Sequence, residues 1–253
     1  MTFSIIARCR ETGAFGAAIT TSDLAVGSRC IRLSHNRGAF LSQHRTDSRL
    51  GDIGIGLLMQ GETAQDAING VASRTDDIEW RQLGAMDAQG RTAAYHGNRM
   101  YSIYTHTAGE DCLALGNILA NEHVTGAMAD AFGGAAGAPF AERLVRALEA
   151  GEIAGGEILG PLRSAALRVT GDEGIDAYDL RVDCSDGHAI ADLRALFTAY
   201  GDRQAALRRV ALRPDTVPVQ RALFDASLAR IRERGLTDRF SAPLHPEDWT
   251  VAG

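Results

Sequence analysis

The sequence lacks the marks of several protein classes. Its four cysteines stand singly, with no Cys-x-x-Cys pair and no His at ligand spacing, as is typical of reduced thiols in a cytosolic protein. No uncharged apolar run reaches the ~18 residues that a membrane helix requires, and no basic-plus-apolar signal opens the chain. We therefore expect a cytoplasmic protein that does not contact a membrane.

Cofactor motifs are also absent. Neither Gly54-Ile55-Gly56 nor Gly133-Gly134 belongs to a G-x-G-x-x-G or P-loop pattern, which argues against a nucleotide cofactor. The histidines form no H-E-x-x-H motif and no i,i+4 pair on a helix, so the sequence predicts no metal site. A net charge of -6 argues against nucleic acid as a partner.

What the chain does contain is pairs of apolar strands alternating with pairs of helices. The apolar alternation and turn residues predict strands at 2–8, 13–21, 26–34, 38–43, 81–87, 91–96, 113–118, 164–170 and 176–183. Helical spacing predicts helices at 50–60, 63–73, 123–132 and 139–150, and a helical tail at 189–234 that is broken around Pro214 and Pro218 and followed by a loop with Pro243 and Pro246.

Hairpins joined to helix pairs favour antiparallel sheets covered by helix layers over a doubly wound parallel sheet. We expect an α+β protein whose 253 residues form a single domain, with an appended helical segment from about residue 213. Exposed apolar positions at helical spacing in that segment, Leu223, Phe224 and Leu228, predict a homodimer or higher homo-oligomer.

The first residues carry the clearest chemistry. Removal of Met1 would leave Thr2 with a free α-amine beside its own hydroxyl. That amine, with an unperturbed pKa near ~8, could act as the base for the hydroxyl nucleophile. The apolar run 3–7 would hold this terminus in a sheet. Many chains begin Met-Thr, however, so Thr2 could equally have no catalytic role.

The ordered set of motifs resembles a bacterial family, domain of unknown function number ten twenty-eight, in the N-terminal-nucleophile (Ntn) hydrolase superfamily. The matching segments run from residue 2 to about residue 200: Thr2 to Arg8, Glu11-Thr12-Gly13, Gly16, Ser42-Gln43, Leu57-Leu58, Gly61, Ala67, Arg81 to Gly84, Asp87, Gly90, Gly97, Gly116 to Ala120, Met128, Phe132, Ala141 to Leu144, Ala154 to Gly156, Ser164 to Leu167 and Asp179 to Asp183.

The resemblance implies the four-layer αββα sandwich of Ntn hydrolases and a nucleophile at Thr2. Four positions depart from the family pattern as we expect it, and we expect them to reshape the pocket: Cys9, His44, His96 and Arg163. The segment after residue 210 has no counterpart in the pattern.

Two amide side chains are candidates for the catalytic site beside Thr2. Asn117 could donate to an oxyanion or simply close a turn. Gln43, at another strand end, could hold substrate or orient the Thr2 amine, or satisfy loop backbone.

The candidates for substrate binding are Arg81, Arg163, His44, Ser164 and Asp183. The two arginines could meet a substrate carboxylate by bidentate pairing, or form structural ion pairs. Asp183 could set the protonation state of the amine or anchor Arg181.

The sequence thus leaves two functions open. The first is hydrolysis of an amide bond in a small molecule or short peptide, with Thr2 as nucleophile. The second is a non-catalytic Ntn-fold protein that binds a small metabolite or acts as an oligomeric scaffold.

Overall fold

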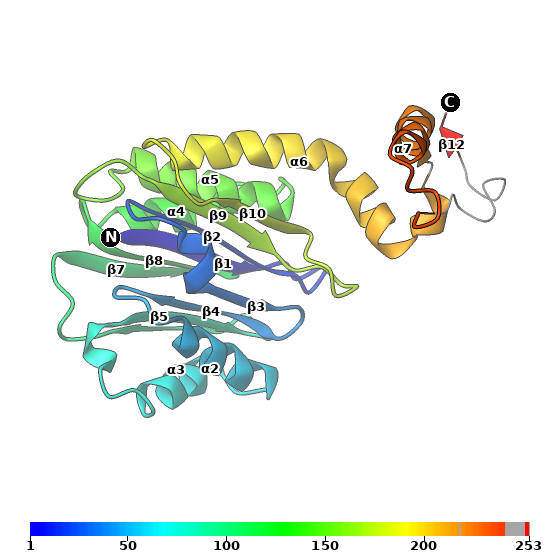
Figure 1. Ribbon diagram of the computed structural model, residues 1–253. Helices are drawn as coiled ribbons and strands as arrows, with labels where there is room; N and C mark the ends of the chain where they lie inside the picture. The colour runs from blue at the N-terminus through cyan, green and yellow to red at the C-terminus, as the bar shows by residue number, and fades with distance from the viewer. Residues whose placement is uncertain (218, 241–250, 253) are drawn as a thin grey trace. The chain divides into compact units, whose positions relative to one another are not determined.

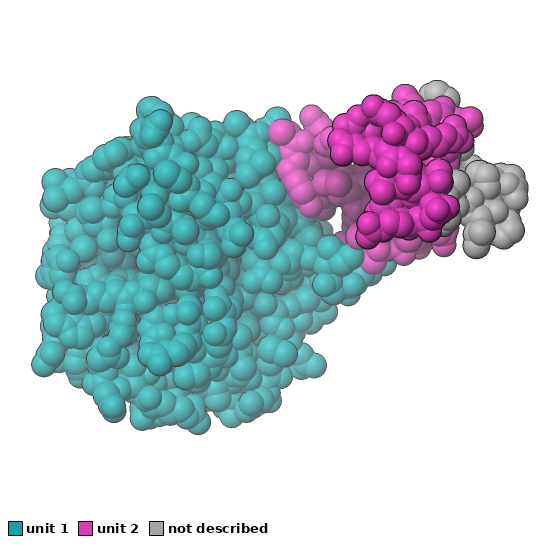
Figure 2. Space-filling view, viewed as in Figure 1, with its two compact units in different colours: residues 1–198 teal, residues 199–253 magenta. Residues whose placement is uncertain are grey.

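We describe the protein from a computed structural model, which covers residues 1–217, 219–240, 251 and 252. The predicted loop with Pro243 and Pro246, and Pro218 itself, lie outside the described residues. The chain divides into two compact units, Met1–Thr198 and Ala199–Gly253 (Figure 2). The prediction of a single domain with an appendage from about residue 213 stays a prediction.

Two antiparallel sheets lie at the centre of the first unit (Figure 1). The six-stranded sheet has the order β10-β9-β2-β1-β8-β7, built from β1 (Thr2–Arg8), β2 (Phe15–Thr21), β7 (Ile103–Gly109), β8 (Cys112–Leu119), β9 (Ser164–Val169) and β10 (Tyr178–Val182). The four-stranded sheet has the order β3-β4-β5-β6, built from β3 (Ile31–Ser34), β4 (Gly38–Gln43), β5 (Gln82–Asp87) and β6 (Thr92–His96).

Helices cover the outer face of each sheet. On the six-stranded sheet lie α4 (Val124–Gly134) and α5 (Phe140–Ile153), and on the four-stranded sheet lie α2 (Ser48–Met59) and α3 (Ala64–Ala72). The helix α6 (Ala189–Leu212) begins over α5, where Arg194 pairs with Glu142 and Glu149. The predicted α+β fold with a four-layer αββα sandwich is confirmed.

Period-two alternation sorts the side chains of the central strands into two cores. On β1, Ile6 faces the other sheet and joins a core with Leu41, Met86 and Leu115. Phe40 on β4 faces outward and packs with α2 and α3. The sheets approach so closely that a Cβ on Gly84 would lie 2.6 Å from Leu115 Cδ1, which only glycine permits.

Two predicted elements need correction. Residues 26–34 were expected to form one strand, but Val26–Cys30 is a short helix, α1, before β3. The left-handed Ala25, with a φ of 52°, turns the chain there, and the buried Ser164 hydroxyl accepts the Val26 N–H at 3.1 Å. Strand β7 is missing from the predicted elements, because it is an edge strand whose polar side chains are partly exposed.

The helical tail is interrupted near Pro214, as the sequence predicted. After α6 come a 3-10 turn, Pro214–Thr216, the short strand β11 (Val219–Gln220) and the helix α7 (Arg221–Glu233). Strand β11 pairs in parallel with β12 (Val251–Ala252). A further 3-10 turn, Ile78–Trp80, precedes β5. Among the described residues, no helix combines the length and hydrophobicity of a membrane crossing.

Candidate functional site

The site candidates Thr2, Gln43 and Asn117 meet at one end of the space between the sheets. Thr2 begins β1, an interior strand, directly opposite Asn117 of β8. Asn117 is on the same face of β8 as Leu113 and Leu115, whose side chains face the four-stranded sheet. Gln43 is on the same face of β4 as Ala39 and Leu41, whose side chains face the six-stranded sheet. Alternation alone therefore brings these polar groups together.

Gln82, which begins β5, joins these groups into one buried network. Its Oε1 accepts hydrogen bonds from Gln43 Nε2 at 2.6 Å and from Asn117 Nδ2 at 2.9 Å. Its Nε2 donates to the Gly116 carbonyl oxygen at 2.8 Å. Ser4 Oγ donates to Gln43 Oε1 at 2.9 Å. The side chains of all four polar residues, Ser4, Gln43, Gln82 and Asn117, are fully buried.

One backbone carbonyl fixes the direction of every bond in this network. The Gly116 oxygen can only accept, so Gln82 must present its NH2 group there and its oxygen to Gln43 and Asn117. Those two amides must then present NH2 groups in turn. Asn117 Oδ1 is consequently directed away from Gln82, and it is a buried atom without a hydrogen-bond partner among the described residues.

Two histidines extend the network to the open edge of the sandwich. Gln82 Nε2 lies 3.0 Å from His96 Nδ1, and His96 Nε2 lies 2.9 Å from His106 Nδ1. Since Gln82 must donate, His96 Nδ1 accepts and its Nε2 carries the proton. Burial, and to a lesser extent the charge of His106, lower the pKa of His96 to about 4, so the ring is neutral at pH 7.

Hydroxyl groups converge on the carbonyl oxygen that precedes Thr2. Thr2 Oγ and Thr21 Oγ both donate to the Met1 carbonyl oxygen. Thr21 ends β2, the neighbouring strand, and is nearly as buried as Ser4. Thr2 itself is 7% exposed, so its hydroxyl is held in place at a nearly closed position.

A carboxylate completes the surroundings of the terminus. Both oxygens of Glu157 accept from the Ser22 N–H, at 3.2 and 3.1 Å. Burial raises the pKa of Glu157, and the Ser22 and Thr21 groups and the positive chain terminus partly offset this. Glu157 therefore lies beside Thr21, whose hydroxyl donates to the Met1 carbonyl oxygen.

The predicted substrate-binding residues separate into two groups. His44 and Arg81 lie at the same end of the four-stranded sheet as Gln43 and Gln82. Ser164 is buried, but its hydroxyl donates to the Asp23 carbonyl oxygen at 2.7 Å and so supports a turn. Arg163 and Asp183 are exposed, and the Asp183 carboxylate lies 4.0 Å from Arg181. The structure places His44 and Arg81 next to the network, and a binding role for all five residues stays a prediction.

The sequence predictions did not name Gln82, Thr21 or Glu157 as site residues. They weighed the histidines as metal ligands and included His96 among the positions expected to reshape the pocket. The alternation along β5 could have indicated Gln82, because it lies on the inward face of that strand with Gly84 and Met86. Among the described residues, no group of three or more His, Cys, Asp or Glu is placed to hold a metal ion.

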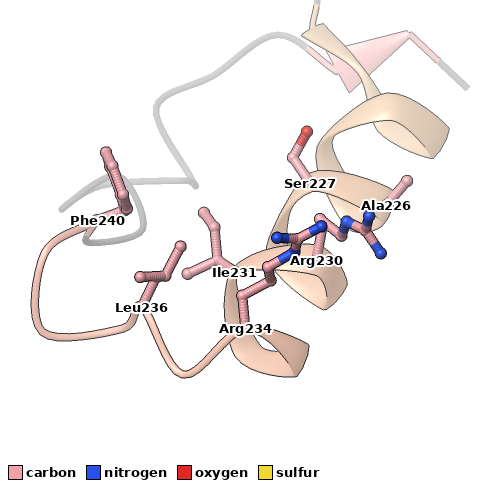
Figure 3. A pocket seen from close by; sticks show the side chains of 7 residues that line it. All are labelled: Ala226, Ser227, Arg230, Ile231, Arg234, Leu236 and Phe240. Atoms are coloured by element: carbon pink, nitrogen blue, oxygen red, sulfur yellow. The ribbon is translucent and has the colours of Figure 1, made fainter.

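A separate pocket lies in the second unit (Figure 3). Its lining combines the two guanidinium groups of Arg230 and Arg234 with the apolar side chains of α7 and the residues after it, including Leu236 and Phe240. The lining residues include no acid, histidine or thiol. A general base is therefore lacking there, and we place the candidate chemistry at Thr2.

Comparison with known proteins gives a family. The model of a family of unknown function, DUF1028, matches residues 2–193. A crystal structure of a Silicibacter pomeroyi protein described as a member of that family is 35% identical, with a TM-score of 0.73, and the match covers 79% of this chain and 85% of that one.

A more distant match is Anbu, the ancestral beta-subunit, from Yersinia bercovieri. It is 10% identical with a TM-score of 0.38, and the match covers 81% of this chain and 96% of that one. No curated protein matches the chain. On the match over residues 2–193 and the Silicibacter pomeroyi relative, the chain belongs to the family of unknown function DUF1028.

Proposed function

We propose that the protein is an Ntn-type amidohydrolase that cleaves an amide bond of a small molecule or short peptide, with Thr2 as nucleophile after Met1 is removed. One observation carries the proposal. The Thr2 hydroxyl is held at the end of an interior strand against a peptide carbonyl oxygen, beside a buried amide with an unused acceptor.

The chemistry would proceed in two steps. The α-amine of Thr2 takes the Oγ proton while Oγ bonds to the substrate carbonyl carbon. The C–N bond then breaks, the proton passes to the leaving nitrogen, and an ester on Thr2 remains. Water, deprotonated by the same amine, attacks the ester and releases the acid.

The network suggests a part for each amide. One N–H of Asn117 Nδ2 is used by Gln82, and a second N–H on the same nitrogen would stabilise the oxyanion. Asn117 is opposite Thr2, and its Oδ1 has no partner among the described residues. This oxygen could accept a hydrogen bond from the freed α-amine. Gln43 and Gln82 would then position Asn117 rather than touch the substrate.

The test combines two measurements. Intact mass of the native protein determines whether Met1 is removed, and an amide library is screened against the wild type and Thr2→Ala. We expect a processed terminus and turnover that Thr2→Ala loses. Full activity in Thr2→Ala would exclude the mechanism, while a retained Met1 and no turnover would favour the non-catalytic binder.

We further propose a homodimer or higher homo-oligomer. In the second unit, the Leu223 side chain on α7 is 64% exposed and that of Phe240 is 53% exposed. Large exposed apolar side chains of this kind favour a protein partner. Light scattering at micromolar concentration checks the assembly, and a monomer there would contradict it.

A further inference from the structure

We propose that the site selects amide substrates that carry a carboxylate close to the amide, and that Arg81, Arg45 and His44 form the recognition surface. This inference rests on the proposed function for the position of the amide at Thr2. It adds a substrate class to that function.

The placement of these residues follows from the pairing of β4 with β5. Gln43, the last residue of β4, is opposite Gln82, the first residue of β5. His44 and Arg45 leave β4 at the point where Trp80 and Arg81 enter β5. Since Gln43 bonds to Ser4 of β1, the two loops lie at the Thr2 end of the sandwich.

The backbone holds His44 and Arg45 in an unusual conformation. Their φ angles are 54° and 49°. This is the left-handed region, which residues other than glycine seldom adopt. His44 Nδ1 lies 2.5 Å from the Trp80 carbonyl oxygen, and the Arg45 guanidinium lies 4.1 Å from the centre of the Trp80 ring. Strain of this kind tends to occur at functional sites, where surrounding contacts maintain it.

Arg81 supplies a donor that no other described residue uses. Its side chain is 12% exposed, and one end of its guanidinium pairs with Asp77. The Nε atom is buried and has no hydrogen-bond partner among the described residues. An unsatisfied buried donor is costly, and a carboxylate oxygen would satisfy it as a charge-assisted acceptor.

Three arginines, Arg45, Arg81 and Arg99, and two acids, Asp77 and Glu79, surround Trp80 in a chain whose net charge is -6. After burial, which is the main cause, the positive chain terminus, Arg45 and Arg81 lower the pKa of His44. Arg99 lies 5.7 Å from the centre of the Trp80 ring. Asp77 pairs with Arg81, and Glu79 Oε2 is a buried atom that also has no hydrogen-bond partner among the described residues. The arginines outnumber the acids around Trp80 in an acidic protein, which favours an anionic ligand.

The test uses binding, so that it does not depend on turnover. Full-length Thr2→Ala is titrated with N-acetylglycine and with N-acetylglycinamide, which share a shape and differ in one charge. We expect N-acetylglycine to bind about tenfold more tightly, as hydrogen bonds to charged groups allow. Adding Arg81→Lys, which keeps the charge for Asp77 but removes Nε–H, should reduce the preference to about twofold.

Arg91→Lys is the matched control. Arg91 also pairs with an aspartate four residues away, Asp87, but lies at the other end of β5, so the preference should be unchanged. Equal binding of the two probes, no saturable binding below about 50 mM, or an equal loss in both variants would overturn the inference. Inorganic phosphate that displaces N-acetylglycine with equal affinity would overturn the carboxylate class in favour of a general anion site.

The proposed nucleophile and this inference can fail separately. If Thr2→Ala retains turnover but the charge preference is found, the Ntn mechanism is wrong and the carboxylate site stands. If Thr2→Ala abolishes turnover and the preference is missing, the mechanism stands and the substrate class is wrong.

Discussion

The two ends of β1 differ in how they satisfy polar groups. At the Arg8 end, opposite charges neutralise one another. Arg8 pairs with Asp111 at 2.9 Å and donates to the Ala88 carbonyl oxygen at 2.7 Å, and Arg10 pairs with the same aspartate at 2.5 Å. At the Thr2 end, buried neutral amides bond to one another and leave Asn117 Oδ1 without a described partner.

The difference separates structural polarity from functional polarity. At the Arg8 end the charged side chains are partly exposed and pair with one another, so their charges are balanced without a ligand. At the Thr2 end the amide side chains are fully buried, and each unmade hydrogen bond there costs free energy. We propose that the open acceptor of Asn117 serves the freed α-amine of Thr2.

The largest expected contrast is in activity. Thr2→Ala should reduce turnover by about 10³-fold or more, because the nucleophile is lost, while Thr2→Ser should keep some activity. Arg8→Gln at the other end should leave turnover close to that of the wild type. Steady-state kinetics on an amide found in the library screen measures this contrast, and comparable losses at both ends would remove it.

The next contrast concerns the oxyanion. Asn117→Ala should slow turnover about 10²-fold, in the range of a single oxyanion donor, without unfolding the chain. Asn69→Ala on α3 serves as the matched control, since Asn69 is exposed and its side chain accepts from Gln65 Nε2 at 3.0 Å. If kcat is unchanged in Asn117→Ala, Asn117 has only a structural role.

A smaller contrast is in stability. Gln82→Met should lower the free energy of unfolding by about 2 kcal/mol, because it leaves two amide NH2 groups and the Gly116 carbonyl without their partner. Asp111→Asn should cost about 1 kcal/mol or less, as partly exposed ion pairs do. Urea unfolding of both variants gives the comparison, and a larger loss in Asp111→Asn would reverse it.

The last contrast depends on pH. The folded pKa of His96, about 4, lies below its unfolded value near ~6.5. The unfolded chain therefore binds the proton first, and stability falls as pH decreases from about 6.5 to about 4. His96→Gln, which keeps an acceptor for Gln82, should flatten this part of the profile. An unchanged slope in the variant would show that another group is responsible.

The strand and helix patterns predicted antiparallel sheets covered by helix layers, and the family resemblance implied the four-layer sandwich. The sequence also indicated Thr2, Gln43 and Asn117 as candidate catalytic residues, because they are polar residues at the ends of apolar strands. Gln82 was harder to find because it looks like one more residue of an apolar strand. Only the pairing of β4 with β5, and the approach of β8 across the sheets, show that it bonds to both amides.

Two other misses have tertiary causes. The helix α1 depends on the Ser164 hydroxyl, which is 138 residues away from Val26 in the sequence. The pairing of His96 with His106 depends on β7, an edge strand with a weak apolar pattern. Contacts of such long range leave no local signal.

The central claim, that Thr2 is the nucleophile once its amine is free, is tested most directly by covalent labelling. Protein with Met1 removed and protein with Met1 retained are each treated with a small β-lactone, and the adduct is located by peptide mass spectrometry. We predict a single acyl group on Thr2 of the processed chain and none on Thr2 of the unprocessed chain. An adduct that is absent from Thr2, or that forms there equally in both proteins, would contradict the claim.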